Sequence, residues 1–170
     1  MKSKQFTSGL FAIYLLYLIW VLVFKMDVTG TLLQSSHLAF RSLNLTLFAG
    51  TAIVDGHLDY LEIGWNVLAF LPLGIYLKVL WSKSSEWFYI CAVFSATLLI
   101  ESIQYIFGFG VADITDLAAN SLGGFIGLIT YSLLEKSFKG RTLQIVNWLG
   151  LILTTLFLYL IHIRGWMRWI

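Results

Sequence analysis

Three carboxylates and two carboxamides lie within twenty residues of one another, in some of the most apolar sequence of the chain. They are Glu101, Gln104, Asp113, Asp116 and Asn120. Burying charged groups in apolar surroundings costs free energy, so each such group needs a structural or functional reason. Carboxylates can act as acid and base, coordinate a hard cation, or accept hydrogen bonds from a polar ligand. All three kinds of chemistry are therefore open for this stretch.

The spacing of these residues places them on helix faces. Glu101, Gln104 and Tyr105 fall at i, i+3 and i+4, so they share one face. A second stripe, with offsets of 3, 7, 10, 11 and 14 residues, comprises Asp113, Asp116, Asn120, Gly123, Gly124 and Gly127. Glycines spaced in this way allow another helix to approach closely. We expect the stripe to be polar where it begins and tightly packed where the glycines follow.

The whole chain has the composition of an integral membrane protein. Its 170 residues are 59% hydrophobic and 12% charged, with a mean hydropathy of +0.84. Soluble domains average about 45–50% apolar and about 25% charged residues. The basic residues form short clusters beside apolar runs, which indicates membrane topology and no nucleic-acid partner. The single cysteine, Cys91, excludes a disulfide within the chain.

Five apolar runs predict an all-α integral membrane bundle that forms one domain over residues 1–170. The transmembrane helices are expected at about 6–24, 61–81, 87–107, 112–134 and 143–162. The first run is longer than the apolar core of a signal peptide, which favours an uncleaved helix over a cleaved leader. Within the long loop between the first two helices, residues 43–54 are apolar but too short to cross a bilayer. An interfacial helix, a re-entrant hairpin and a packed loop are all open for this piece.

Basic residues near the helix ends predict a cytoplasmic N-terminus. That orientation places seven of them inside (Lys2, Lys4, Lys78, Lys83, Lys136, Lys139 and Arg141) and four outside (Lys25, Arg41, Arg164 and Arg168). The long loop is then extracytoplasmic. At about 1.5 Å of rise per residue, Asn66, Glu101 and Asp113 all lie near the outer boundary of the membrane. Arg41 and Asn44 lie in the loop on that same side.

Structural roles account for part of this pattern. Asp113 or Asp116 can cap the helix that they begin, and Arg41 can serve as a structural counter-ion. His37 and His57 are expected in solvent. Capping alone does not require polar groups on three helices and a loop, so we predict a ligand-binding set of Arg41, Asn44, Asn66, Glu101, Gln104, Asp113, Asp116 and Asn120. If the site performs a reaction, the expected catalytic groups are Glu101, Asp113 and Asp116.

The same residues carry a resemblance to a known family, over about residues 41–130. Asn66-Val-Leu-Ala-Phe-Leu-Pro72-Leu-Gly74, then Glu101-x-x-Gln104, then Asp113-Ile-Thr-Asp116-x-x-x-Asn120-x-x-Gly123-Gly124 resembles the VanZ-like membrane protein family in order and spacing. Arg41-Ser-Leu-Asn44-Leu resembles that family's Arg-x-x-Asn-Leu element. The family usually follows this element with a proline, whereas this chain has Thr46-Leu47-Phe48, which leaves the conformation after Asn44 open.

The resemblance implies a multi-pass protein of the bacterial plasma membrane that acts at the cell envelope. The founding member is associated with low-level resistance to teicoplanin, within a glycopeptide-resistance cluster of Gram-positive bacteria. We therefore expect a non-enzymatic envelope factor. Its outward-facing polar pocket would bind a lipid-linked cell-wall component or a lipoglycopeptide. Membrane lipids are the other expected partners, and the oligomeric state is open.

Two other functions stay open. An outer-leaflet enzyme could act on a lipid-linked phosphate or sugar, with Glu101 protonated and Asp116 ionised beside Arg41. Its carboxylates could hold Mg²⁺, but the sequence has no Cys/His metal pattern, and we expect neither a metal site nor a cofactor. Transport ranks third, because polar groups confined to the outer third of the helices form no path across a bilayer.

Overall fold

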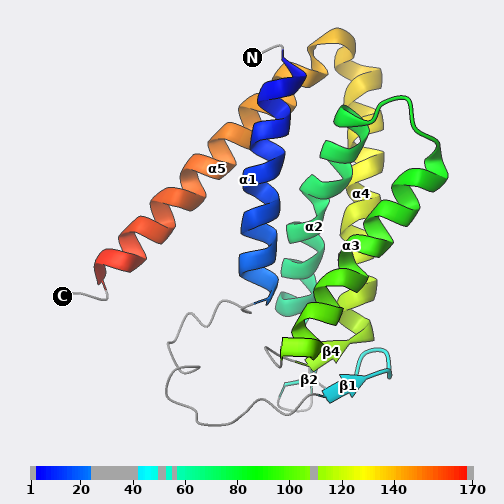
Figure 1. The fold of residues 1–170 in the computed structure, drawn as a ribbon, viewed down its shortest axis with the longest axis vertical. Coiled ribbons are helices and arrows are strands. Elements are labelled where there is room, and N and C mark those ends of the chain that lie inside the picture. The colour runs from blue at the N-terminus through cyan, green and yellow to red at the C-terminus, as the bar shows by residue number, and fades with distance from the viewer. Residues whose placement is uncertain (1–2, 24–41, 50–52, 55–56, 108–110, 168–170) are drawn as a thin grey trace.

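The computed structural model describes residues 3–23, 42–49, 53–54, 57–107 and 111–167, with side chains as far as residue 159. Within these residues the chain is mostly helical (Figure 1). The α-helices are α1 (Lys4–Val23), α2 (Tyr60–Leu80), α3 (Glu86–Phe107), α4 (Ile114–Phe138) and α5 (Thr142–Met167), and a 3-10 helix, η3 (Lys139–Arg141), joins the last two. Each helix lies close to one of the apolar runs in the sequence.

Four stretches of the described chain are long and apolar enough to cross a membrane. They are Lys4–Leu22, Tyr60–Leu80, Glu86–Phe107 and Ile114–Tyr159. The last is 46 residues long and contains α4, η3 and much of α5. A mostly helical protein with membrane-spanning stretches is therefore confirmed, whereas five separate crossings and a long extracytoplasmic loop stay predictions. Residues 24–41 of that loop lie outside the described residues.

The helices extend between two ends of the molecule (Figure 1). One end, which we name the turn end, holds the start of α1, the turn between α2 and α3, and η3. The other, which we name the strand end, holds the end of α3, the start of α4 and the short strands. Residues far apart in the sequence therefore meet at each end.

Glycines bring α2 and α4 into backbone contact. A Cβ atom added at Gly123 would overlap the carbonyl oxygen of Val67, and one at Gly127 would overlap that of Leu71. On α2, a Cβ at Gly74 would overlap the carbonyl oxygen of Gly124. Only glycine permits such an approach, which is the small-residue packing expected from the sequence. This contact fixes the position of the polar start of α4 relative to α2.

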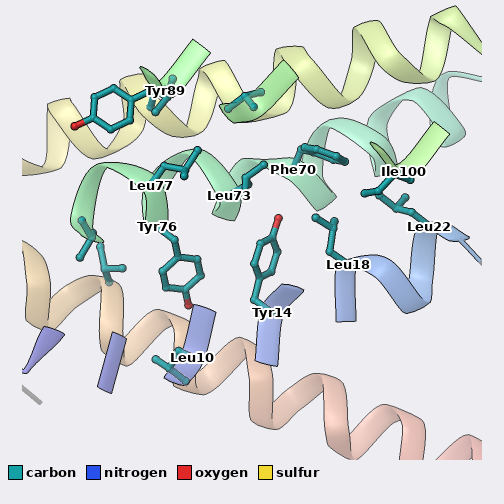
Figure 2. Close-up of a cluster of buried hydrophobic side chains, with 14 residues drawn as sticks. Leu10, Tyr14, Leu18, Leu22, Phe70, Leu73, Tyr76, Leu77, Tyr89 and Ile100 are labelled. Atoms are coloured by element: carbon teal, nitrogen blue, oxygen red, sulfur yellow. The ribbon is translucent and has the colours of Figure 1, made fainter. Parts of the chain in front are cut away.

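The apolar core lies along α1, α2 and α3 (Figure 2). Tyr14 and Tyr76 fill the space between α1 and α2, with ring centroids 5.7 Å apart. The Tyr14 hydroxyl donates a hydrogen bond to the Ala69 carbonyl at 2.8 Å. The opposite helix faces expose large apolar side chains, among them Leu16 (71% exposed) and Leu99 (60%). An exposed apolar surface of this kind suits helices that are surrounded by lipid.

Short strands at the strand end were not part of the all-α prediction. β1 (Ser42–Asn44) pairs in parallel with β4 (Val111–Asp113), and β2 (Ile53–Val54) pairs antiparallel with β3 (His57–Leu58). The described residues of the 43–54 piece form short strands and a turn, and their large apolar side chains are exposed, so the choice among the three options stays a prediction. The helix expected from residue 112 begins at Ile114, because Asp113 has an extended backbone and acts as the helix N-cap.

Candidate functional site

Asp113 connects the start of α4 to the strands. Its Oδ1 accepts a hydrogen bond from the backbone N–H of Thr115 at 2.8 Å, which caps the helix. Its Oδ2 accepts a second hydrogen bond from Asn44 Nδ2 at 2.9 Å. Asn44 is also the β1 residue that faces Asp113 in the strand register. The capping role considered from the sequence is therefore confirmed for Asp113, and the same carboxylate also holds the loop against the helix.

Asn44 also shapes the segment that follows β1. Its Nδ2 donates to the Ala49 carbonyl at 2.8 Å, and its Oδ1 accepts from the Thr46 backbone N–H at 3.0 Å. Phe48 adopts a left-handed backbone with φ of 55°, which is uncommon for a bulky residue, and its N–H donates to Thr115 Oγ1 at 3.0 Å. The segment after Asn44, whose conformation the sequence left open, is a turn that docks on α4.

Glu101 attaches α3 to the same point. Its Oε2 accepts a hydrogen bond from the backbone N–H of Asp113 at 3.1 Å. Only 6% of Glu101 and 2% of Asp113 are exposed. A carboxyl group of α3 thus contacts the backbone of the α4 N-cap residue in a buried position, where hydrogen bonds carry more weight than in water.

Asn66 and Asp116 join α2 to α4. Asn66 Nδ2 donates to Asp116 Oδ1 at 2.7 Å, and both residues are buried. In this buried position the hydrogen bond carries more weight than it would in water. This bond lies just beyond the glycine contact between α2 and α4, so the tight packing and the polar pairing support each other.

Several buried polar atoms in this region have no hydrogen-bond partner among the described residues. They are Oγ1 of Thr97, Oε1 of Gln104, Oδ1 of Asn120 and Oγ of Ser121. Gln104 uses its other polar atom, since Nε2 donates to the Leu22 carbonyl of α1 at 2.9 Å. Leaving a buried polar atom unpaired costs about 1–3 kcal/mol. Among the described residues, the region therefore holds more hydrogen-bonding capacity than the contacts between them use.

Helix geometry places Thr97 at the same level as Asn120. A Cβ at Gly124 of α4 would meet the side chain of Val93 of α3, so these two positions face each other. The two helices run in opposite directions. One helical turn from this contact toward the strand end, α3 reaches Thr97 and α4 reaches Asn120. One further turn reaches Glu101 on α3. The unpaired atoms therefore continue the cluster into the bundle.

The structure brings most of the sequence-predicted residues together. Asn44 and Glu101 both hydrogen-bond to Asp113, which joins β1 and α3 to β4. Asn66 hydrogen-bonds to Asp116, which joins α2 to α4. Asn120 is buried on the same stripe, whereas Gln104 binds α1. Arg41 lies outside the described residues. We name the strand-end cluster as these seven described residues: Asn44, Asn66, Glu101, Gln104, Asp113, Asp116 and Asn120.

Sequence reasoning did not select Thr97, Thr115 and Ser121 as site residues. Thr97 is four residues before Glu101 and therefore shares its helix face, which is a signal that the sequence contained. Thr115 accepts a hydrogen bond from Phe48, a contact that depends on the turn after β1 and has no sequence signal. Ser121 is buried beside Asn120.

The strand-end cluster is buried in the described structure. Six of its seven members have exposures of 8% or less, and only Asn44 is partly exposed. An outward-facing open pocket at this place therefore stays a prediction. The described residues contain no group of three or more His, Cys, Asp or Glu side chains that could hold a metal ion.

Comparisons with known proteins give a consistent result. A family model described as VanZ/LLP1 matches residues 11–135. Protein VanZ from Enterococcus faecium is 35% identical over 164 residues, which cover 95% of this chain and 97% of that protein. No solved structure matches the chain. The matched region contains the entire strand-end cluster.

Proposed function

We propose that this chain, which belongs to the VanZ/LLP1 family, is a bacterial envelope membrane protein that lowers susceptibility to teicoplanin. The strand-end cluster would do so by binding a cell-wall component, a lipid-linked intermediate or the lipoglycopeptide itself. Family membership over nearly the whole chain supports the cellular setting. The observation that carries the site is the burial of two hydrogen-bonded pairs, Asn66 with Asp116 and Glu101 with Asp113, where α2, α3 and the start of α4 meet.

The orientation belongs to the same proposal. We place the N-terminus in the cytoplasm and count five crossings, with α4 and α5 crossing separately. Support comes from their lengths of 25 and 26 residues, each enough for a bilayer core that needs about 20. Lys136 in the last turn of α4 and Lys139 and Arg141 in η3 lie where the two helices join, and the positive-inside rule favours the cytoplasm for this point. The strand-end cluster then faces the outside of the cell.

The chemistry of the cluster suggests what its ligand offers. Carboxylate oxygens and the unpaired amide oxygens of Gln104 and Asn120 are hydrogen-bond acceptors. A ligand that suits them presents donors, as the hydroxyls of a sugar or the amides of a peptide do. Asn44 is the partly exposed member and its bond to Asp113 is the outermost contact of the cluster. A ligand would therefore enter by displacing Asn44 from Asp113.

Drug susceptibility of a host tests this proposal. A susceptible Gram-positive strain producing the protein should have a higher inhibitory concentration of teicoplanin than the same strain without it. Asp116→Asn and Glu101→Gln keep the side-chain shape and remove the charge, so each should return the value to that of the empty strain. Unchanged resistance in both variants, or no effect of the natural protein at normal membrane levels, would contradict the proposal.

A buried polar pair at the turn end supplies the matched control. Thr7 Oγ1 donates to Asn147 Oδ1 at 2.8 Å, and both residues are fully buried. Thr7→Val removes this hydrogen bond without touching the strand-end cluster. Its membrane level should be compared by immunoblot with those of the cluster variants. Resistance should persist in Thr7→Val, which separates loss of binding from general loss of stability.

An outer-leaflet enzyme is the second candidate, favoured by the contact between Glu101 and the backbone of Asp113. Two nearby carboxyl groups in different surroundings can divide the roles of acid and base. Purified protein incubated with labelled undecaprenyl-linked substrates, with and without Mg²⁺, tests it. Product that forms with the natural protein and disappears in Glu101→Gln would favour catalysis over binding alone.

A further inference from the structure

A hollow of about 500 Å³ lies at the turn end, far from the strand-end cluster. It is lined by α2, the turn that follows it, α3 and α4, through Lys78, Ser82, Ser84, Glu86, Tyr89, Tyr131, Ser132, Glu135, Lys136 and Lys139. Figure 1 shows α3 leaning away from α4 toward this end. Nothing in the proposed resistance function uses this hollow.

The charge of the hollow is positive and partly fixed. Three lysines and two glutamates line it. Lys78 is held in place, because its Nζ binds Glu86 Oε1 at 2.6 Å and lies 4.7 Å from the centre of the Tyr89 ring. Lys136 and Lys139 are exposed, and no ion pair joins either of them to another described residue. Two lysines at the rim are therefore available to an anion.

Hydroxyl groups around these lysines add neutral hydrogen bonds. Ser84 and Tyr131 line the hollow and are only partly buried. Ser82 accepts a hydrogen bond from Lys4 Nζ at 3.2 Å, which brings a further positive charge to the same place. Lysine ammonium groups combined with hydroxyl donors suit the oxygens of a phosphate.

The surroundings indicate that this phosphate belongs to a lipid. Trp81 and Trp87 flank the turn and are 42% and 75% exposed, as is typical of aromatic residues at the membrane interface. Ile90 and Leu133, next to lining residues on α3 and α4, expose apolar side chains. A soluble anion would make no favourable contact with such an apolar rim, whereas the acyl chains of a lipid would pack against it. Basic pockets between membrane helices bind anionic head groups by this combination.

We propose that the turn-end hollow binds the head-group phosphate of an anionic phospholipid. Lys136 and Lys139 at the rim pair with the phosphate, and Lys78, which is paired with Glu86, lies deeper in the hollow. The ligand chemistry is a phosphate diester, and its acyl chains lie along the apolar surfaces of α3 and α4. The proposal does not depend on the strand-end cluster or on the direction in which the protein is inserted.

Native mass spectrometry of the full-length protein in detergent tests the proposal with three probes. Phosphatidylglycerol is anionic, phosphatidylethanolamine has no net charge, and glycerol 3-phosphate has the phosphate without acyl chains. We expect phosphatidylglycerol to bind at least 5-fold more tightly than phosphatidylethanolamine. Glycerol 3-phosphate should bind at least 10-fold more weakly than phosphatidylglycerol. Equal binding of the two lipids, or equal binding of the soluble phosphate, would overturn the proposal.

Two double variants that each lose two positive charges distinguish lipid binding in the hollow from a nonspecific attraction of anionic lipid to the positive end of the protein. Lys136→Gln with Lys139→Gln removes two charges from the hollow, and should weaken phosphatidylglycerol binding at least 5-fold. Lys83→Gln with Arg141→Gln removes two exposed charges from the same end but outside the hollow, and should change binding less than 2-fold. Glu135→Gln removes a negative lining charge and should strengthen binding about 2-fold. Equal loss in the two double variants would overturn a specific site.

Discussion

The two ends of the bundle use charge in opposite ways. At the strand end, acidic and amide side chains are buried and hydrogen-bonded to one another and to backbone groups. At the turn end, Lys136 and Lys139 are exposed around an open hollow, and the one ion pair among the described residues there, Lys78 with Glu86, lines it. Buried charges constrain the helices that carry them, whereas exposed charges mainly attract what is outside.

Burial decides what a charged side chain does at each end of this protein. A carboxylate that is 2% exposed, such as Asp113, must satisfy its oxygens from within the protein, so it ties distant segments together. A lysine at the rim of a hollow has water and lipid head groups available, so it contributes little to the fold. The strand end is therefore expected to be sensitive to single substitutions, and the turn end tolerant of them.

The largest effect is expected at the glycine contact between α2 and α4, which lies between the two ends. Gly127→Ala places a methyl group against the Leu71 carbonyl, so the backbones must move apart, and it should lower the free energy of unfolding by about 3 kcal/mol or more. The Asn66–Asp116 hydrogen bond joins the same two helices. Thermal unfolding in detergent micelles, followed by circular dichroism, measures the loss.

Gly64→Ala is the control for this substitution. Gly64 is also in a helix, but no atom lies within 4 Å of the position that its Cβ would take. Alanine has the higher helix propensity, so stability should stay the same or rise by up to about 1 kcal/mol. Equal destabilisation by the two alanines would mean that helix α4 does not need glycine at its contact with α2.

An intermediate effect is expected for the pair Asn66 and Asp116. Asp116→Ala leaves the buried Asn66 amide without its acceptor and should cost about 1.5–3 kcal/mol. A double-mutant cycle with Asn66→Ala should return a coupling energy of about 1 kcal/mol or more. Chemical denaturation of the four proteins gives this value. A coupling energy near zero would mean that the hydrogen bond between Asn66 and Asp116 does not stabilise the protein.

The smallest effect is expected for the ion pair at the turn end. Glu86 is 73% exposed on its side chain, so Glu86→Gln should change stability by less than about 1 kcal/mol. Raising the salt concentration should reduce even this difference, because exposed charges are screened. A loss as large as that of Asp116→Ala would erase the distinction between the two ends.

The sequence predicted the helices and most of the polar cluster, because both rest on local patterns. Apolar runs of about 20 residues define membrane helices, and the i, i+3, i+7 spacing placed Asp113, Asp116 and Asn120 on one face of α4. The glycines marked the contact with another helix. The predicted topology added Asn66 and the loop residue Asn44, which no spacing within one helix could connect to Glu101.

Pairing between distant segments could not be predicted in this way. β1 has three residues and β4 has three, which is too short for a strand pattern to stand out. The bond from Phe48 to Thr115 depends on a left-handed backbone at a phenylalanine, which its residue type disfavours. The hollow at the turn end depends on the divergence of α3 from α4, a property of packing and not of any single segment.

The parallel pairing of β1 with β4 also sets an order of events during synthesis. Asn44 and Asp113 are 69 residues apart, and both α2 and α3 lie between them. At about 5–20 residues per second, the ribosome needs roughly 3–14 s to supply the second partner after the first. The strand-end cluster can close only after both intervening helices have been made and placed. We therefore expect the cluster to form late, after the central helices have been inserted into the membrane.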